Sequence, residues 1–296
     1  MDEPWDRVTA SGTLEDMIEN ARAAGFDIQK RTIHDWIARG LLDQPVRRGA
    51  GRGSRPGLHS VNQRKLFLLL LSKREQMPKL PALALVPLGI WLWWGEEWVS
   101  TRQALKAFRT WFGDGARSQA VCHEAALRMQ DQLDHPLASE TARTRFVRLF
   151  EAISYRGRMT DSDREELETA ARAVFEPPSV FGSTFILRAV GPPAASITVD
   201  AVVTHTTAMI AAITALREGR LSEESLVQAR ALYRKSKHNY AELRPYFAAQ
   251  ATAPMSPLFA ERTLGEELNN CGKDLLLIAG LLLTSPRAQQ AAANAS

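Results

Sequence analysis

The chain has 296 residues, a formal net charge of +4 and two cysteines. This length allows two domains with sizeable cores, and an apolar share of 45% with a charged share of 24% is ordinary for a soluble globular protein. Cys122 and Cys271 lie far apart, which argues against a disulfide framework and against a cysteine-based metal site. The first residues are acidic and contain no apolar segment, so no signal peptide is expected.

The first predicted elements are two short amphipathic helices. The first begins after Thr13, which forms an imperfect capping box with Asp16, and it ends at Gly25. The second is stopped by Gly40. Each helix has one apolar face, made by Leu14, Met17, Ile18 and Ala21 in the first and by Ile33, Trp36, Ile37 and Leu41 in the second. Two such helices around a tight turn predict a helix-turn-helix unit.

A basic stretch follows, from Gln44 to Arg74. It contains eight Lys and Arg residues and no Asp or Glu, so its formal charge is +8 and the rest of the chain sums to −4. Residues 45–57 hold four glycines and four arginines, which predicts a hairpin tip. Ser60 and Gln63 form a second capping-box signature, at the start of a helix through Leu71. Such a concentration of positive charge is typical of nucleic-acid binding.

The rest of the chain is predicted to be helical almost throughout. The expected helices span residues 83–97, 101–112, 117–133, 139–155, 162–175, 194–218, 222–243 and 264–284. Residues 196–203 are β-branched enough to be ambiguous, and Pro245 is expected to stop a helix. The predicted fold is mainly α, with an N-terminal winged helix-turn-helix and a C-terminal all-α bundle. The predicted domains are 1–78 and 79–285, with 286–296 as a disordered tail.

The N-terminal pattern resembles one known family. The residues that carry the resemblance are Arg31-Thr32-Ile33, Trp36, Gly40-Leu41-Leu42, Pro45, Arg47 and Gly57-Leu58-His59-Ser60, which are similar to the winged helix-turn-helix of MerR-type regulators. In that family a Thr-Ile pair opens the recognition helix, a Gly-Leu-Leu segment ends it, and an Arg-rich wing leads into a new helix. His34 and Asp35 depart from the Arg and Tyr that commonly follow the Thr-Ile pair. The resemblance covers about a fifth of the chain and implies a DNA-binding head.

Candidate DNA contacts fall into three groups. The second helix offers side chains with base-edge chemistry: Gln29, Lys30, Arg31, Thr32, His34, Asp35 and Arg39. The hairpin offers Arg47, Arg48, Arg52 and Arg55 to phosphates or to a narrow minor groove. Arg64 and Lys65, on the following helix, would contact the DNA backbone. The alternatives are a merely solvated helix face and a disordered basic loop that binds DNA without specificity.

Four tryptophans between residues 91 and 98 are the second unusual feature. Trp91, Trp94 and Trp98 are expected to share one helical face. Two interpretations remain open for this face. It could dock the two domains together, or it could form an aromatic ligand pocket with Glu96, Glu97 or Arg102 as polar anchors.

No catalytic, metal or cofactor site is predicted. Glu96 and Glu97 are sequence neighbours and therefore point apart on a helix, and the same holds for Cys122 and His123. The glycine-rich segment at residues 49–54 lacks the Gly-Lys-Ser/Thr ending of a phosphate-binding loop. The apolar stretches at residues 80–94 and 275–283 are shorter than the roughly 20 residues that a membrane span needs, so no membrane contact is expected.

These features together predict a cytoplasmic, nucleoid-associated protein that is not an enzyme. Its predicted function is that of a sequence-specific regulator of bacterial type, which binds double-stranded DNA as a homodimer. The helical domain would hold the dimer together and could take a small-molecule or protein effector. The alternatives are an architectural, excisionase-like DNA-binding factor of a mobile element, a helical ligand-binding protein that uses the Trp91–Trp98 face, and a peripheral membrane protein anchored by Leu80–Trp94.

Overall fold

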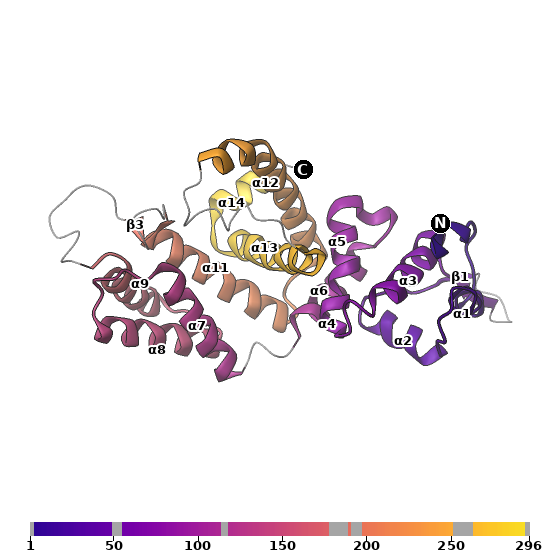
Figure 1. Ribbon diagram of the computed structural model, residues 1–296, viewed down its shortest axis with the longest axis horizontal. Coiled ribbons are helices and arrows are strands. Elements are labelled where there is room, and N and C mark those ends of the chain that lie inside the picture. The colour runs from indigo at the N-terminus through magenta and orange to yellow at the C-terminus, as the bar shows by residue number, and fades with distance from the viewer. Residues whose placement is uncertain are drawn as a thin grey trace. The chain divides into compact units, whose positions relative to one another are not determined.

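The computed structural model describes residues 3–48, 55–113, 118–177, 189–190, 197–250 and 263–293. The described chain is mainly helical, as predicted, with two short antiparallel strand pairs (Figure 1). It divides into two compact units. The first comprises Met1–Gly113 and Arg262–Lys273, and the second comprises Asp114–Glu261 and Asp274–Ser296.

The first unit begins with a short 3-10 helix, η1 (Pro4–Arg7), and with α1 (Leu14–Ala23). The capping box predicted for α1 is confirmed, because the Thr13 amide donates to the Asp16 carboxylate at 2.6 Å and the Asp16 amide donates to the Thr13 hydroxyl at 3.3 Å. The helix ends at Gly25, whose φ of 86° is the left-handed conformation that glycine adopts without strain. The Phe26 amide then donates to the Ala21 carbonyl at 2.8 Å and completes a Schellman motif.

The second helix, α2 (Lys30–Ala38), ends in the same way. Gly40 has a φ of 77°, and the Leu41 amide donates to the Trp36 carbonyl at 2.9 Å. The position needs glycine for a second reason as well. A Cβ on Gly40 would lie 2.7 Å from the Gln103 carbonyl oxygen, so the end of α2 packs directly against the backbone of another helix.

The predicted hairpin is present and consists of β1 (Val46–Arg48) and β2 (Arg55–Leu58). The strands are antiparallel, with Val46 opposite Leu58 and Arg48 opposite Arg55. The tip, residues 49–54, lies outside the described residues. After β2, the backbone of His59 pairs with that of Gly12 through hydrogen bonds of 2.8 and 3.0 Å. This bridge joins the base of the hairpin to the segment that leads into α1.

Helix α3 (Val61–Lys73) completes the packing around α1 and α2. Its N-terminal Ser60 hydroxyl accepts from the Gln63 amide at 3.2 Å, as predicted. The Gln63 side chain does not close the predicted capping box, however, since it points toward other segments. In the core, the rings of Trp36 and Phe67 meet edge to face with centroids 5.8 Å apart.

The first unit continues past residue 78, where a domain boundary was predicted. It includes α4 (Leu80–Leu83), α5 (Leu85–Trp94), the 3-10 helix η2 (Gly95–Glu97), α6 (Thr101–Phe112) and the start of α13 (Leu264–Thr284). The buried Gln63 side chain joins segments that lie before and after residue 78. It accepts from the Asp43 amide and donates to the Trp98 carbonyl and to Gln103, each at 2.8 Å. Gln103 in turn donates to the Leu41 carbonyl at 3.0 Å.

The single helix predicted over residues 83–97 is wrong in detail, because Gly95 has a φ of 80° and ends α5. Trp98 therefore lies beyond the helix that carries the other tryptophans. Trp91 is fully buried, whereas Trp94 is 65% exposed, so the three residues do not form one face. The Trp91 indole donates to the Thr101 hydroxyl at 3.2 Å, which fixes α5 to the start of α6.

The second unit is built from α7 (Gln119–Leu133), α8 (Glu140–Arg156), α9 (Asp161–Phe175), α11 (Val199–Arg217), α12 (Glu223–Gln250), the later part of α13 and α14 (Pro286–Ala293). Aromatic rings lie at the centre of its core. Phe146 packs against Phe175 with ring centroids 5.0 Å apart and against Phe150 at 5.8 Å. The same core includes Leu167 and Val203.

Three expectations for the second unit need correction. Of the ambiguous residues 196–203, those that the structure describes form β4 (Ile197–Thr198), which pairs with β3 (Ala189–Val190), and the start of α11. Pro245 does not stop α12, which continues to Gln250. The tail expected to be disordered from residue 286 contains α14, whose Ala292 is buried.

One helix within the described ranges, α11, is long and apolar enough to cross a membrane. Half of its most apolar window is buried inside the protein. A core helix of a soluble protein gives the same pattern. The apolar residues of α5 are also mostly buried, among them Leu88, Trp91 and Leu92.

Candidate nucleic-acid interface

The polar side chains of α2 lie on the side of the helix that faces away from the core. Ile33, Trp36 and Ile37 are buried, and the residues between them point outward. We call this outward set the α2 outer face; it consists of Gln29, Lys30, Arg31, Thr32, His34, Asp35 and Arg39, all exposed except the half-buried Thr32. The structure thus brings all seven predicted α2 contacts to one surface.

Two basic residues of the α2 outer face have acidic partners. Lys30 contacts Glu15 at 2.6 Å, and Arg39 contacts Asp35 at 3.0 Å. Both pairs are solvent-exposed, and exposed ion pairs contribute about 1 kcal/mol or less. Either cation can therefore exchange its carboxylate for a phosphate at little cost. Arg31 has no ion-pair partner within the described part of the chain.

The hairpin follows α2 in the chain and leads into His59. Burial lowers the pKa of His59, which is 1% exposed, while the Asp43 carboxylate raises it and Arg64 lowers it. On the hairpin itself, Arg47 is exposed. Arg52 and the side chains of Arg48 and Arg55 lie outside what the structure describes.

Arg64 is placed differently from the arginines of the α2 outer face. Its guanidinium donates to the Ala10 carbonyl at 2.6 Å and to the Asn20 side chain. It also lies so close to Gly12 that a Cβ there would come within 2.7 Å of the guanidinium carbon. Arg64 therefore ties α3 to α1 and to the segment before it. Lys65, the other predicted contact on α3, is half-buried.

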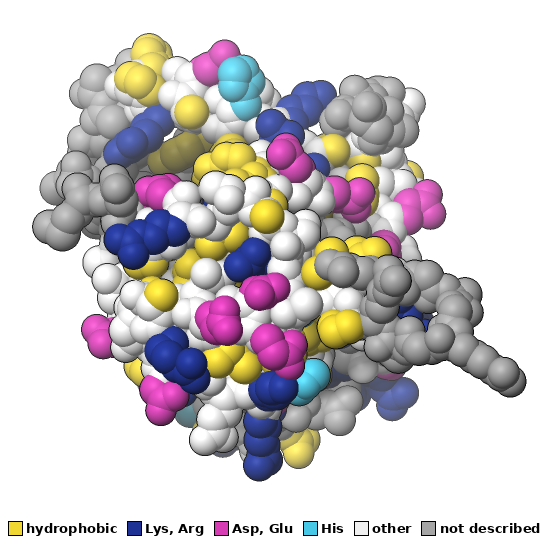
Figure 2. Space-filling model, turned by 90° about the vertical axis from the view of Figure 1, so that its right-hand side faces the viewer, with side chains coloured by type: hydrophobic (Ala, Val, Ile, Leu, Met, Phe, Trp, Pro, Cys, Tyr) yellow, Lys and Arg dark blue, Asp and Glu magenta, His cyan; other side chains and the backbone are white. Residues whose placement is uncertain are grey.

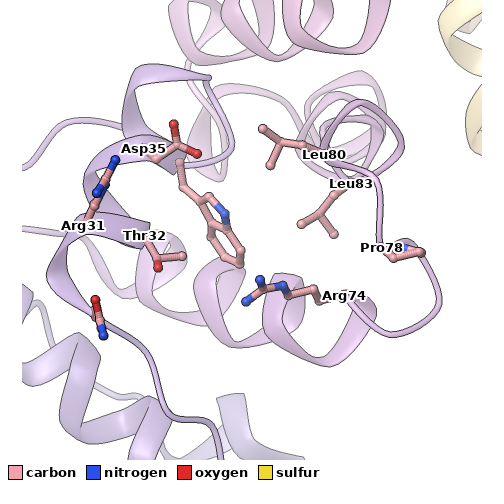
Figure 3. A pocket seen from close by; sticks show the side chains of 9 residues that line it. Arg31, Thr32, Asp35, Arg74, Pro78, Leu80 and Leu83 are labelled. Carbon is pink, nitrogen blue, oxygen red and sulfur yellow. The ribbon is translucent and has the colours of Figure 1, made fainter.

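A hollow of about 480 Å³ adjoins the α2 outer face (Figure 3). We call it the α2 hollow; it is lined by Gln29, Arg31, Thr32, Asp35, Trp36, Arg74, Pro78, Leu80 and Leu83. Arg74 was not among the predicted contacts, although it is the last residue of the basic stretch. The three apolar residues after it could not be assigned from the sequence, because α4 reaches the hollow only through the tertiary fold.

The charged side chains of the protein surface are of both signs. On the face that Figure 2 presents, Lys and Arg side chains are interspersed with Asp and Glu side chains. The α2 outer face reflects this mixture, since it contains Asp35 and lies next to Glu15. The formal charge of the basic stretch therefore overstates how basic the described surface is. Recognition here would depend on individual side chains more than on a uniform field.

The tryptophan segment does not form the predicted ligand face. Trp91 is buried against α6, Trp94 is exposed, Trp98 is half-buried and Arg102 is exposed. Glu96, one of the expected polar anchors, accepts hydrogen bonds from the amide and the hydroxyl of Thr101 at the start of α6. These contacts explain how η2 turns the chain into α6.

The described residues contain no cluster of three His, Cys, Asp or Glu side chains that could hold a metal ion. His123 contacts Glu151 at 2.7 Å, on the exposed side of the second unit. Its sequence neighbour Cys122 is buried, and this burial raises the pKa of the thiol, which disfavours the nucleophilic thiolate.

Comparisons with known protein families, curated proteins and solved structures found no match to this chain.

Proposed function

We propose that the chain is a sequence-specific regulator of bacterial type that binds double-stranded DNA through the α2 outer face and the hairpin. The N-terminal part of the chain would act as a MerR-like winged helix-turn-helix, in which α2 enters the major groove and the hairpin lies beside it. The single observation that carries the proposal is that a short helix, α2, exposes its polar side chains and is followed in the chain by a hairpin whose Arg47 is exposed.

The chemistry of these side chains suits base recognition. Arg31 can donate two hydrogen bonds to guanine, Gln29 can pair with adenine, and Asp35 can accept from the amino group of cytosine. Thr32 can contact a phosphate or a thymine methyl group. Arg47 on the hairpin is exposed and can neutralise a phosphate or enter a narrow minor groove.

The rigidity of α2 also supports this function. Its C-terminal end is held by Gly40 against α6, and the Thr110 hydroxyl donates to the Arg39 carbonyl at 2.7 Å. The buried Trp36 packs on Phe67 of α3. A helix fixed at these points presents its outer side chains in one geometry, which base recognition requires.

We further propose that the protein acts as a homodimer, because one small module contacts few base pairs and a doubled half-site gives useful specificity. The helical second unit would supply the contact between protomers. This part of the proposal predicts that selected DNA sites contain two related half-sites.

The test begins by selecting bound fragments from random duplex DNA with the full chain. The affinity of the selected duplex is then measured for the parent protein, for Arg31→Ala and for Arg22→Ala, whose arginine is exposed on α1 outside the proposed surface. We expect Arg31→Ala to weaken binding by about 10- to 100-fold and to relax the preference at one base position, whereas Arg22→Ala changes little. Failure to enrich any sequence would refute sequence-specific binding.

A further inference from the structure

The α2 hollow has two chemically different sides. Figure 3 shows Arg31, Thr32 and Asp35 of α2 on one side, and Pro78, Leu80 and Leu83 on the opposite side. The Arg74 side chain lies between them. With a volume of about 480 Å³, the hollow is within the range of small-molecule sites, which extends from roughly 300 to 1,000 Å³.

The local sequence explains why this space stays open. Helix α3 ends at Lys73, and Pro78 and Pro81 redirect the chain before it enters α4, whose first turn contains Pro81. Helix α4 therefore returns beside α2 without covering it. Trp36 forms part of the wall and is held in place by its edge-to-face contact with Phe67.

Two arginine side chains of the hollow, Arg31 and Arg74, can bind an anion. Neither Arg31 nor Arg74 has an ion-pair or side-chain hydrogen-bond partner within the described ranges. The one acidic residue of the lining, Asp35, already contacts Arg39 at 3.0 Å. A guanidinium group can bind a carboxylate, sulfonate or phosphate group with paired hydrogen bonds.

The apolar side distinguishes between a small ligand and a DNA phosphate. A phosphate of a duplex would satisfy an arginine of the hollow but would leave the exposed Pro78 and the half-buried Leu80 without a partner. A small molecule with an anionic group on a flat apolar body would satisfy both sides, because its body would cover Pro78 and Leu80. We propose that the α2 hollow binds a small amphipathic anion of this class, such as an aromatic carboxylate.

The position of the hollow gives this ligand a regulatory effect, and this step rests on the proposed function. Gln29, Arg31, Thr32 and Asp35 line the hollow and also belong to the surface proposed to contact bases. The ligand and the duplex therefore compete for the same side chains. By linkage, each lowers the affinity of the other by the same factor. The effector site would thus lie in the first unit, between α2 and α4.

Three probes separate the two chemical requirements. These are 2-naphthoate, which has both the anion and the apolar body, 2-naphthamide, which has only the body, and inorganic phosphate, which has only the anion. Binding to the full chain is measured by ligand-observed NMR titration. We expect 2-naphthoate to bind at least about tenfold more tightly than either partial probe, because only it uses both sides of the hollow.

Substitutions of lining residues test whether 2-naphthoate binds in the α2 hollow. Arg74→Ala and Leu80→Ser are each expected to weaken 2-naphthoate binding by about tenfold, while Arg22→Ala leaves it unchanged. Circular dichroism confirms that each variant is folded. The site is refuted if 2-naphthoate does not bind, if it binds no better than 2-naphthamide, or if Arg74→Ala and Leu80→Ser leave its affinity unchanged.

A final titration tests the competition separately from DNA binding itself. The selected duplex should displace 2-naphthoate from the parent protein. If the duplex binds and 2-naphthoate stays bound, the regulatory step is wrong and the ligand site stands. If no duplex binds at all, the proposed function fails while the binding data still decide the site. If Arg74→Ala weakens duplex binding and 2-naphthoate does not bind the parent protein, the hollow holds a DNA phosphate and the ligand proposal is refuted.

Discussion

Arg31, His34 and Arg47 lie exposed on α2 and the hairpin, whereas His59, Gln63 and Arg64 are turned into the first unit. We call the first set the outward region and the second the inward region. Both sets come from the same short part of the chain. The outward side chains are free to bind another molecule, while the inward ones hold α1, α3 and α6 together. Formal charge therefore locates a region of interest but does not say which of its residues can bind.

The close packing of α2 on α6 holds α2 in place, so disturbing it should cost the most stability. We expect Gly40→Ala to destabilise the first unit by about 3 to 4 kcal/mol, since the new Cβ would combine left-handed strain with overlap against α6. Amide hydrogen exchange of α2 in the full chain measures the effect.

Gly25→Ala is the matched control for this substitution. Gly25 also has a positive φ, but a Cβ there would meet nothing within 4 Å. Only the backbone strain remains, which costs about 1 to 2 kcal/mol. Equal effects of the two substitutions would show that α2 does not pack closely on α6.

A smaller loss is expected for Gln63→Ala, which removes three hydrogen bonds of 2.8 Å in a buried setting. We expect about 2 to 3 kcal/mol, because the Asp43 amide and Gln103 lose their partner. Asn62→Ala, at the adjacent position, removes one exposed hydrogen bond to the Glu97 carbonyl and should cost less than about 1 kcal/mol. Chemical denaturation of both variants checks the difference, and similar losses would contradict the importance of the buried network.

The stability of the folded state is expected to depend on pH through His59. Neither ring nitrogen has a hydrogen-bond partner in the described structure, and burial lowers the pKa of the ring below its ordinary value of 6.5. The folded state thus keeps His59 neutral, whereas the unfolded chain takes up a proton as the pH falls below about 6.5. Stability is therefore fully present above this pH and is lost below it, by at most about 1.4 kcal/mol per pH unit for one proton.

Hydrogen exchange of α3 between pH 7.5 and 5.5, corrected for the intrinsic rate, measures this loss. A local probe is needed because burial also lowers the pKa of His205 in the second unit. In His59→Phe the loss should be smaller, since the titrating ring is gone. An unchanged pH profile in this variant would show that His59 is not the responsible group.

The smallest effect on stability is expected in the outward region. Arg31→Ala should change the unfolding free energy by less than about 0.5 kcal/mol, because Arg31 is exposed and makes no ion pair with the described residues. The same substitution is expected to weaken duplex binding strongly. A large destabilisation would mean that Arg31 belongs to the inward region.

Local chemistry made much of the helical pattern predictable. Thr13 with Asp16 and the glycines at 25 and 40 act within one turn of the helix end that they define. The exposure of the α2 outer face follows in the same way from the spacing of Ile33, Trp36 and Ile37.

Long-range contacts explain what could not be predicted. Gln63 was assigned to a local capping box, but its amide reaches segments 35 and 40 residues away. Arg64 was assigned to DNA because nothing in the sequence shows that Ala10 and Asn20 would accept its hydrogen bonds. The role of Arg74 depends on α4 returning beside α2, which is also a property of the tertiary fold.

The proposed function requires the outward region to bind a duplex and to recognise its base sequence. The most direct measurement is the affinity of the parent protein and of Arg31→Ala and Arg47→Ala for the selected duplex and for a scrambled duplex, over a series of salt concentrations. We expect Arg31→Ala to lower the ratio of the two affinities, and Arg47→Ala to weaken both equally and reduce the salt slope by about one. If neither substitution changes the affinities or the slope while Arg64→Ala abolishes binding in a folded protein, the outward region is not the DNA-binding surface.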